Sequence, residues 1–165
     1  VKANPKDYEA QANVMWAGMV AHNNLCGVGR RQDWGTHAME HQLSAHYGVA
    51  HGAGLAVMFP AWMKYVLEHD VARFAQIAVR VWGCELNEAD HKATALAGIA
   101  KYEEFLQSLG LPLSFAEIGA KEEDIPKLIS TMGITSANAE NPVHTGDFVP
   151  LFAEDVAKIY KLACK

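Results

Sequence analysis

The spacing of its apolar residues is the feature that most constrains how this chain can fold. Apolar side chains recur every three or four residues through most of the sequence, whereas runs in which apolar and polar residues alternate are nearly absent. The first pattern is typical of helices that bury one face. With 165 residues, of which 50% are hydrophobic, the chain can bury roughly 70% of the surface that its unfolded form exposes. We therefore predict an all-α fold, with residues 1–165 forming a single helical domain.

Caps, glycines and prolines set the expected ends of the helices. Predicted helices cover residues 7–25, 34–46, 71–81, 87–109 and 153–163, a longer apolar helix runs to about residue 68, and a short one follows Pro126. The first of them carries one apolar stripe, formed by Tyr8, Ala12, Met15, Trp16, Met19 and Val20. We expect Asn87 to cap the helix that it begins, and Pro60 to kink its helix because proline removes a backbone donor. Residues 133–150 are rich in turn-forming residues and are expected to form an ordered loop.

Charge and cysteine content exclude several classes of protein. A formal net charge of −5, with 14 Lys and Arg spread along the chain, does not suit a nucleic-acid-binding module, which clusters basic residues against phosphates. Three cysteines without a C-x-x-C pair fit neither a disulfide framework nor a zinc ribbon and are typical of the reducing cytoplasm.

The first residues lack the pattern of a signal peptide, and the apolar run 53–66 is interrupted by Pro60 and Lys64. We expect a cytoplasmic protein without a membrane span.

Histidines carry the main chemical signal of the sequence. Four of the eight, His37, His41, His46 and His51, fall within fifteen residues. His37 and His41 are four residues apart, so on a helix their rings lie on one face and can converge on one site. His46 is out of phase and should point elsewhere. His51 follows Gly48, and a chain reversal there would return it toward His37, which gives His37 and His51 a candidate metal role.

Taken alone, this histidine spacing is a weak signal. A pair in H-x-x-x-H needs a carboxylate or a further ligand at a defined place before it indicates a metal site. No H-E-x-x-H is present, and Glu40, directly before His41, is in the wrong position for the base of a zinc protease of that type. The remaining histidines are expected to be solvated or hydrogen-bonded, as most are; they are His22, His69, His91 and His144.

A longer stretch around these histidines resembles a known family. Residues 33–45, DWGTHAMEHQLSA, followed by His51-Gly52 and the apolar run to Pro60, are similar to the signature of the iron-containing alcohol dehydrogenases, and most similar to the butanol-dehydrogenase-like branch. Segments 8–29, 110–112 and 151–163 also resemble corresponding segments of that branch. The resemblance covers almost the whole chain.

The resemblance implies a two-domain enzyme, an NAD(P)-dependent alcohol dehydrogenase that interconverts primary alcohols and aldehydes. This chain resembles its carboxy-terminal half, a multi-helical bundle of the kind also found in dehydroquinate synthase. In the family one Asp and three His hold a divalent metal, Fe²⁺ or Zn²⁺; the last two histidines correspond to His37 and His51. The histidine that corresponds to His41 lies beside the nicotinamide and the substrate as a proton-relay group. Trp34 is expected to line the substrate pocket.

Two departures from the family pattern concern cofactor binding. The family's Asp and first His ligand would fall before Val1, and no G-x-G-x-x-G turn occurs in the sequence. The resemblance therefore implies that NAD(P)H is bound mainly by an amino-terminal domain that is not in this sequence. The isolated chain is expected to be inactive as a dehydrogenase and to bind metal weakly, since it holds two of the four ligands. The longer enzyme is expected to be a homo-oligomer, a dimer.

Other interpretations remain open at this point. One is a stand-alone helical metal-binding or interaction module, which would need further ligands from His22, Asp33 or His46. Others are a relative of glycerol dehydrogenase or dehydroquinate synthase, and a purely structural helical protein.

Apolar residues flank the histidines and predict an exposed patch through which the chain self-associates; they are Trp34, Met39, Leu43, Leu55 and Met58.

Overall fold

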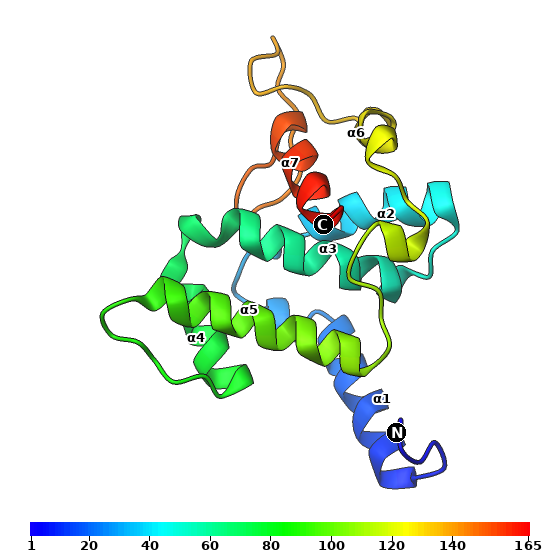
Figure 1. Ribbon diagram of the computed structural model, residues 1–165, viewed down its shortest axis with the longest axis vertical. Helices are drawn as coiled ribbons and strands as arrows, with labels where there is room; N and C mark the ends of the chain where they lie inside the picture. Colours follow the sequence, from blue (N-terminus) through cyan, green and yellow to red (C-terminus); the bar gives the residue numbers. More distant parts are fainter. The chain divides into compact units, whose positions relative to one another are not determined.

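The computed structural model describes all 165 residues and contains seven α-helices and no β-strand, which confirms the all-α fold. The helices are α1 (Tyr8–His22), α2 (Gly35–Tyr47), α3 (His51–Val66), α4 (Val71–Trp82), α5 (His91–Ser108), α6 (Ile125–Met132) and α7 (Ala153–Ala163). They are drawn in Figure 1. The chain forms two compact units, Val1–Gln32 and Asp33–Lys165. None of the helices is long and apolar enough to cross a membrane.

The first unit consists mainly of α1 and a short 3-10 turn over Leu25–Gly27. The Asp7 side chain caps α1 by accepting from the backbone N–H of Ala10 at 3.0 Å. The helix ends at His22, earlier than predicted, because Asn24 takes a left-handed conformation with φ of 65°. No residue of α1 is buried. The apolar stripe predicted here therefore covers no core within the unit.

The core of the second unit lies where α3 meets α2, α5 and α7. Residues from each of these helices are fully enclosed, among them Met39, Leu43, Met58, Ile99, Ile159 and Tyr160. Helix α3 contributes most, because it is apolar on nearly all sides and is covered on several of them. It continues through the buried Pro60 to Val66, so Pro60 does not end the helix.

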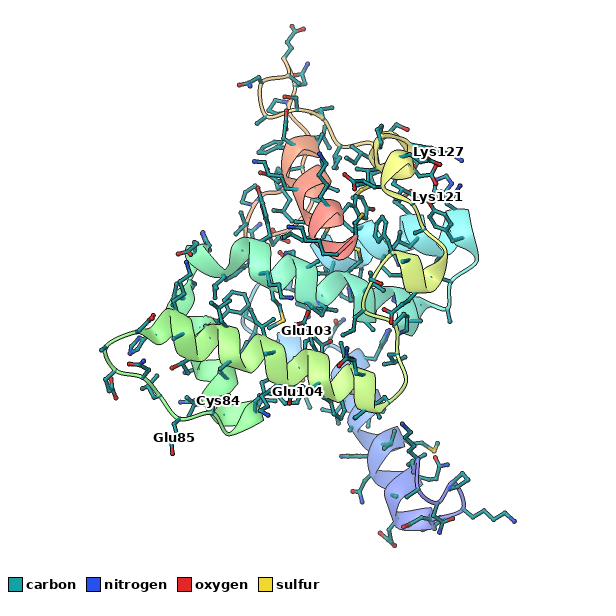
Figure 2. All side chains as sticks on the ribbon, in the orientation of Figure 1. Cys84, Glu85, Glu103, Glu104, Lys121 and Lys127 are labelled. Carbon is teal, nitrogen blue, oxygen red and sulfur yellow. The ribbon has the colours of Figure 1, made fainter.

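Helices α4 and α5 run side by side in Figure 1 and form a closely packed pair. Gly98 permits this approach, because a Cβ atom on it would overlap Ala78. The prediction that Asn87 begins and caps α5 is wrong. Its side chain accepts from the N–H groups of Ala89 and Asp90 at 3.1 Å and closes a turn, and Asp90 is the cap. An ion pair joins α3 to α5, between Lys64 and the partly buried Glu103 at 2.6 Å. Figure 2 labels Glu103 and Glu104 on this helix.

The segment between α6 and α7 is the ordered loop that the sequence predicted. Thr135 donates its N–H to the carbonyl of Val143 at 2.9 Å, and Thr145 and Leu151 exchange two backbone hydrogen bonds of 3.0 and 2.8 Å. The final helix, α7, spans Ala153–Ala163 as predicted. Because Tyr160 of α7 is buried against α2 and donates to the carbonyl of Met39 at 2.8 Å, α7 supports the helix that carries most of the clustered histidines.

Candidate metal centre

A tight turn between α2 and α3 brings the clustered histidines together. Helix α2 ends at Gly48, whose φ of 67° is left-handed and whose N–H bonds to the carbonyl of Ser44 at 3.0 Å. A glycine takes this conformation without strain and ends the helix. Ala50 then precedes α3, which begins at His51 and packs against α2. The expected return of His51 toward α2 is confirmed.

Three imidazole rings lie close together between these helices. The ring centres of His37 and His51 are 5.3 Å apart, those of His41 and His51 also 5.3 Å, and those of His37 and His41 6.4 Å. Two imidazoles on one tetrahedral metal place their ring centres about 5 Å apart, given a metal–nitrogen distance of about 2.1 Å. His51 therefore matches this spacing with either partner, whereas the His37–His41 pair is wider. The donor set fits a divalent metal such as Zn²⁺ or Fe²⁺, both of which accept imidazole.

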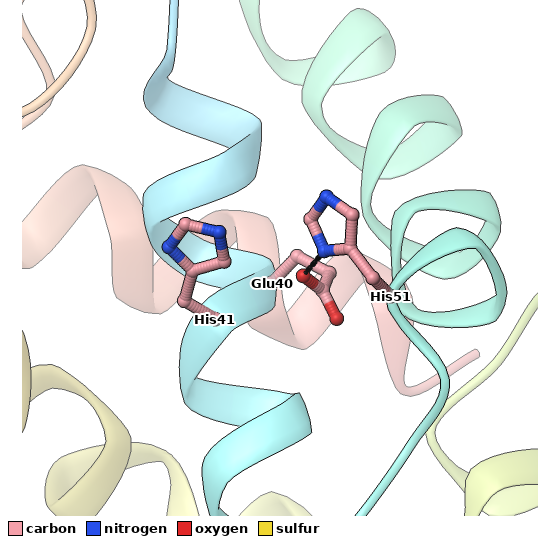
Figure 3. Close-up of side chains that lie close together, drawn as sticks. All are labelled: Glu40, His41 and His51. Carbon is pink, nitrogen blue, oxygen red and sulfur yellow. Dashed lines mark hydrogen bonds and ion pairs between the residues drawn. The ribbon is translucent and has the colours of Figure 1, made fainter.

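Glu40 belongs to the same cluster and was missed as a functional candidate. Its carboxylate contacts Nδ1 of His51, and ligand atoms of Glu40, His41 and His51 all lie within 4.8 Å of one another. Figure 3 shows Glu40 and His41 on α2 and His51 on α3. Sequence reasoning tested Glu40 only as the base of a zinc protease motif. The signal that could have identified Glu40 is its spacing from Ser44. The two residues are four positions apart, so on a helix they lie on one face, where the serine hydroxyl can donate to the carboxylate.

Trp34, the predicted pocket residue, lies at the start of α2 beside His37, with ring centres 4.7 Å apart. It is 52% exposed. The ring of Phe59, on α3, also lies near His37, with ring centres 6.2 Å apart. His37 therefore has two aromatic neighbours. A separate hollow of about 720 Å³ between α3, α5 and α7 is lined by none of the histidines.

Two residues considered as further ligands are engaged elsewhere. His46 points away from the cluster, as expected, and its Nε2 lies 3.4 Å from Thr131 Oγ1 on α6. Asp33 accepts from the N–H groups of Gly35 at 2.8 Å and of Asp147 and Phe148 at 2.7 Å each. Its carboxylate therefore ties the loop before α7 to the start of α2.

The prediction of an exposed apolar patch around the histidines is wrong. Met39, Leu43 and Met58 are fully buried, because α7 and the other core helices cover the faces on which they lie. Only Trp34 of the predicted set is largely exposed. Several strongly exposed apolar side chains occur on α1, where Tyr8, Val14, Met15 and Trp16 are each at least 60% exposed.

One titratable group under the site is held in its neutral form. Burial, the main cause, and the negative charge of Glu40 both raise the pKa of Tyr160 far above the usual value for tyrosine. The hydroxyl therefore stays protonated and keeps donating to the backbone of α2. This fixed hydrogen bond gives α2 a rigid support beneath the histidines.

Fold and site together define an all-α domain with a candidate metal centre between two packed helices. The model of the Fe-containing alcohol dehydrogenase family, C-terminal, matches residues 1–164. This chain belongs to that family, which confirms the resemblance seen in the sequence.

Individual relatives agree with this assignment. The chain is 36% identical over 156 residues to NADH-dependent butanol dehydrogenase A of Clostridium acetobutylicum, covering 94% of this chain and 39% of that protein. It is 35% identical over 128 residues to NADPH-dependent aldehyde reductase YqhD of Escherichia coli, covering 78% of this chain and 33% of that protein. The crystal structure of NADH-dependent butanol dehydrogenase A from Thermotoga maritima superposes with a TM-score of 0.87 at 39% identity, covering 99% of this chain and 41% of that one. The chain thus spans about two fifths or less of the length of these relatives.

Proposed function

We propose that this chain works as the helical part of a metal-dependent, NAD(P)-linked alcohol dehydrogenase that interconverts primary alcohols and aldehydes. The observation that carries the proposal is the clustering of three imidazole rings between α2 and α3, with 5.3 Å between the ring centres of His51 and each of the other two. The relatives named as butanol dehydrogenases and aldehyde reductase support the substrate class.

In this proposal His37 and His51 hold the metal through neutral imidazole nitrogens. A bound divalent ion supplies a Lewis acid that polarises the oxygen of the substrate. His41 is 5.3 Å from His51 by ring centre and exposed to solvent, so it is placed to accept or return the proton of the alcohol and pass it outward. Trp34 and Phe59 flank His37 and keep water from one side of the site.

The metal ligands and nucleotide contacts that complete such an enzyme come, in this proposal, from residues outside this sequence. Imidazole donors suit both Fe²⁺ and Zn²⁺, so the proposal includes either metal. It also includes either NADH or NADPH, since one relative is named for each. We further propose a homodimer, supported by the exposed apolar side chains of α1, and a reducing cytoplasmic location, supported by three free cysteines.

The test measures reduction of butanal with NADH or NADPH by the protein that contains this chain, after loading with Fe²⁺ or Zn²⁺. We expect turnover that requires the metal and that falls by at least about a hundredfold in His37→Ala and His51→Ala, since each removes a ligand. His46→Ala is the matched control, because His46 is on the same helix but contacts α6. Turnover that survives metal removal, or that falls equally in His46→Ala, would contradict the proposal.

A further inference from the structure

Glu40 is a charged residue in an unusual position, because its side chain is completely buried while the side chain of its partner His51 is 48% exposed. A carboxylate without water needs hydrogen-bond donors to offset the loss of hydration. Glu40 has two such partners, the Nδ1 atom of His51 and the hydroxyl of Ser44. These two hydrogen bonds offset the free energy lost when the carboxylate is removed from water, so both partners are needed to keep Glu40 buried.

The surroundings of Glu40 leave its carboxylate little freedom. Ser44 Oγ lies 2.5 Å from Oε1 of Glu40 and 2.9 Å from the carbonyl oxygen of Val49, in the turn that follows α2. Gly54 of α3 also approaches Glu40, so closely that a Cβ atom there would lie 2.7 Å from Cγ of Glu40. Ser44 and Gly54 therefore form a cradle for this carboxylate, with one residue from each helix.

This geometry determines which nitrogen of His51 can serve as a donor to a metal. A carboxylate only accepts hydrogen bonds, so Nδ1 of His51 carries the hydrogen and donates it to Glu40. The lone pair is then on Nε2, which points away from Glu40 in Figure 3. A histidine whose other N–H is held by a carboxylate is a better oriented and more basic metal ligand.

We propose that Glu40 is a positioning residue that fixes the orientation and the tautomer of His51, so that Nε2 of His51 faces the metal. In this proposal Glu40 acts through His51 and is not itself a ligand: one of its oxygens contacts Nδ1 of His51, the other contacts Ser44 Oγ, and its side chain is completely buried. The inference rests on the proposed metal-dependent function, and it adds a residue that acts through His51. Ser44 and Gly54 take part by holding Glu40 in place.

The first test reads the tautomer of His51 by nitrogen-15 NMR of the metal-free chain in alkaline buffer. In the unaltered chain we expect Nδ1 to carry the hydrogen. Glu40→Gln should keep this state, because the amide oxygen of glutamine can accept from Nδ1 while its NH₂ donates to Ser44. Glu40→Ala should give a mixture of both tautomers. An unchanged tautomer in Glu40→Ala would overturn the proposal.

A second test measures, by visible absorption, the affinity for Co²⁺ of the protein that contains this chain. Loss of an outer partner of a metal-ligating histidine typically weakens metal binding by about 10- to 100-fold, which we expect for Glu40→Ala but not for Glu40→Gln. If Glu40 were a ligand, Glu40→Gln would weaken binding as much as Glu40→Ala, and the proposal would fail. Leu43→Ala is the control for lost stability, because Leu43 is buried on the same helix without forming part of the cluster.

Two features keep these tests decisive. Ser44→Ala removes only one support of the carboxylate, so it reports on Glu40 even if Glu40→Ala does not fold; we expect a partial loss of the preferred tautomer, and no loss would count against the cradle. The NMR experiment needs neither metal nor substrate. A Glu40-dependent tautomer in a protein without dehydrogenase activity would therefore refute the proposed function and leave the role of Glu40 intact.

Discussion

The cradle around Glu40 predicts that one glycine of α3 cannot be replaced by alanine without loss of stability. A Cβ atom on Gly54 would lie 2.7 Å from Cγ and 2.9 Å from Cδ of Glu40. Alanine in an open helical position stabilises by up to about 1 kcal/mol relative to glycine. Here overpacking costs about 1–3 kcal/mol, and a disturbed hydrogen bond to a charged group adds about 1.5–3 kcal/mol. We expect Gly54→Ala to lower the free energy of unfolding by about 2 kcal/mol or more.

The assay is urea unfolding followed by circular dichroism, together with a thermal scan in which the melting temperature should fall by roughly 4–8 °C. Gly52→Ala is the matched control, because Gly52 lies two residues earlier in the same helix and nothing lies within 4 Å of a Cβ atom there. That variant should be as stable as the unaltered chain or slightly more stable. Equal stability of Gly54→Ala and Gly52→Ala would refute the reasoning, since it would show that Glu40 can move at no cost.

Three further predictions concern other parts of the chain. Asp33→Ala removes the carboxylate that accepts from three backbone N–H groups, two of them in the loop before α7. Amide hydrogen exchange in residues 133–150 should therefore accelerate by about tenfold or more, for a loss of roughly 1.5–3 kcal/mol. Unchanged exchange would contradict the role of Asp33 in holding this loop. Burial and the hydrogen bond to Asp155 raise the pKa of Tyr65 to about 12, so the contribution of Tyr65 to stability is complete below pH 10 and is lost as the pH rises toward 12. Comparing the ultraviolet pH titration of the unaltered chain with that of Tyr65→Phe should show that Tyr65 loses its proton at a raised pH. Loss of its proton at the usual pH of a tyrosine would contradict the prediction. Replacing Met15 and Trp16 by serine should reduce self-association in light scattering, because both are exposed on α1; equal association would show that other residues mediate it.

Local sequence patterns predicted the ends of helices well wherever one residue, such as a glycine, ends the helix. Gly83 ends α4 with a φ of 67°, and α7 has the predicted bounds. The start of α5 was misplaced because Asn87 and Asp90 are both good caps, and only the structure shows that Asn87 closes the preceding turn. Periodicity identifies candidate helices but does not choose between two neighbouring caps.

The candidate site was predictable in part. The convergence of His37, His41 and His51 followed from helical spacing and the Gly48 turn. The pairing of Glu40 with His51 depends on the register of α2 against α3, which no local pattern specifies. The burial of Met39 also had to come from the structure, because it rests on Tyr160, 121 residues away in the chain.

The short connection between α2 and α3 has a consequence for how the histidine cluster forms. The rings, their carboxylate partner and the glycine that makes room for it all lie in one helical hairpin, joined by residues 48–50. Closing so short a loop costs little chain entropy, so the hairpin can assemble early and present its nitrogen donors already arranged. In the proposed metal site, an ion that binds later would meet donors that are already arranged and would need to order few residues of this chain. Lengthening the turn by even one residue would move His51 out of register with α2, whereas insertions at the exposed residues 140–142, away from the part of the loop that Asp33 holds, would leave the donors where they are.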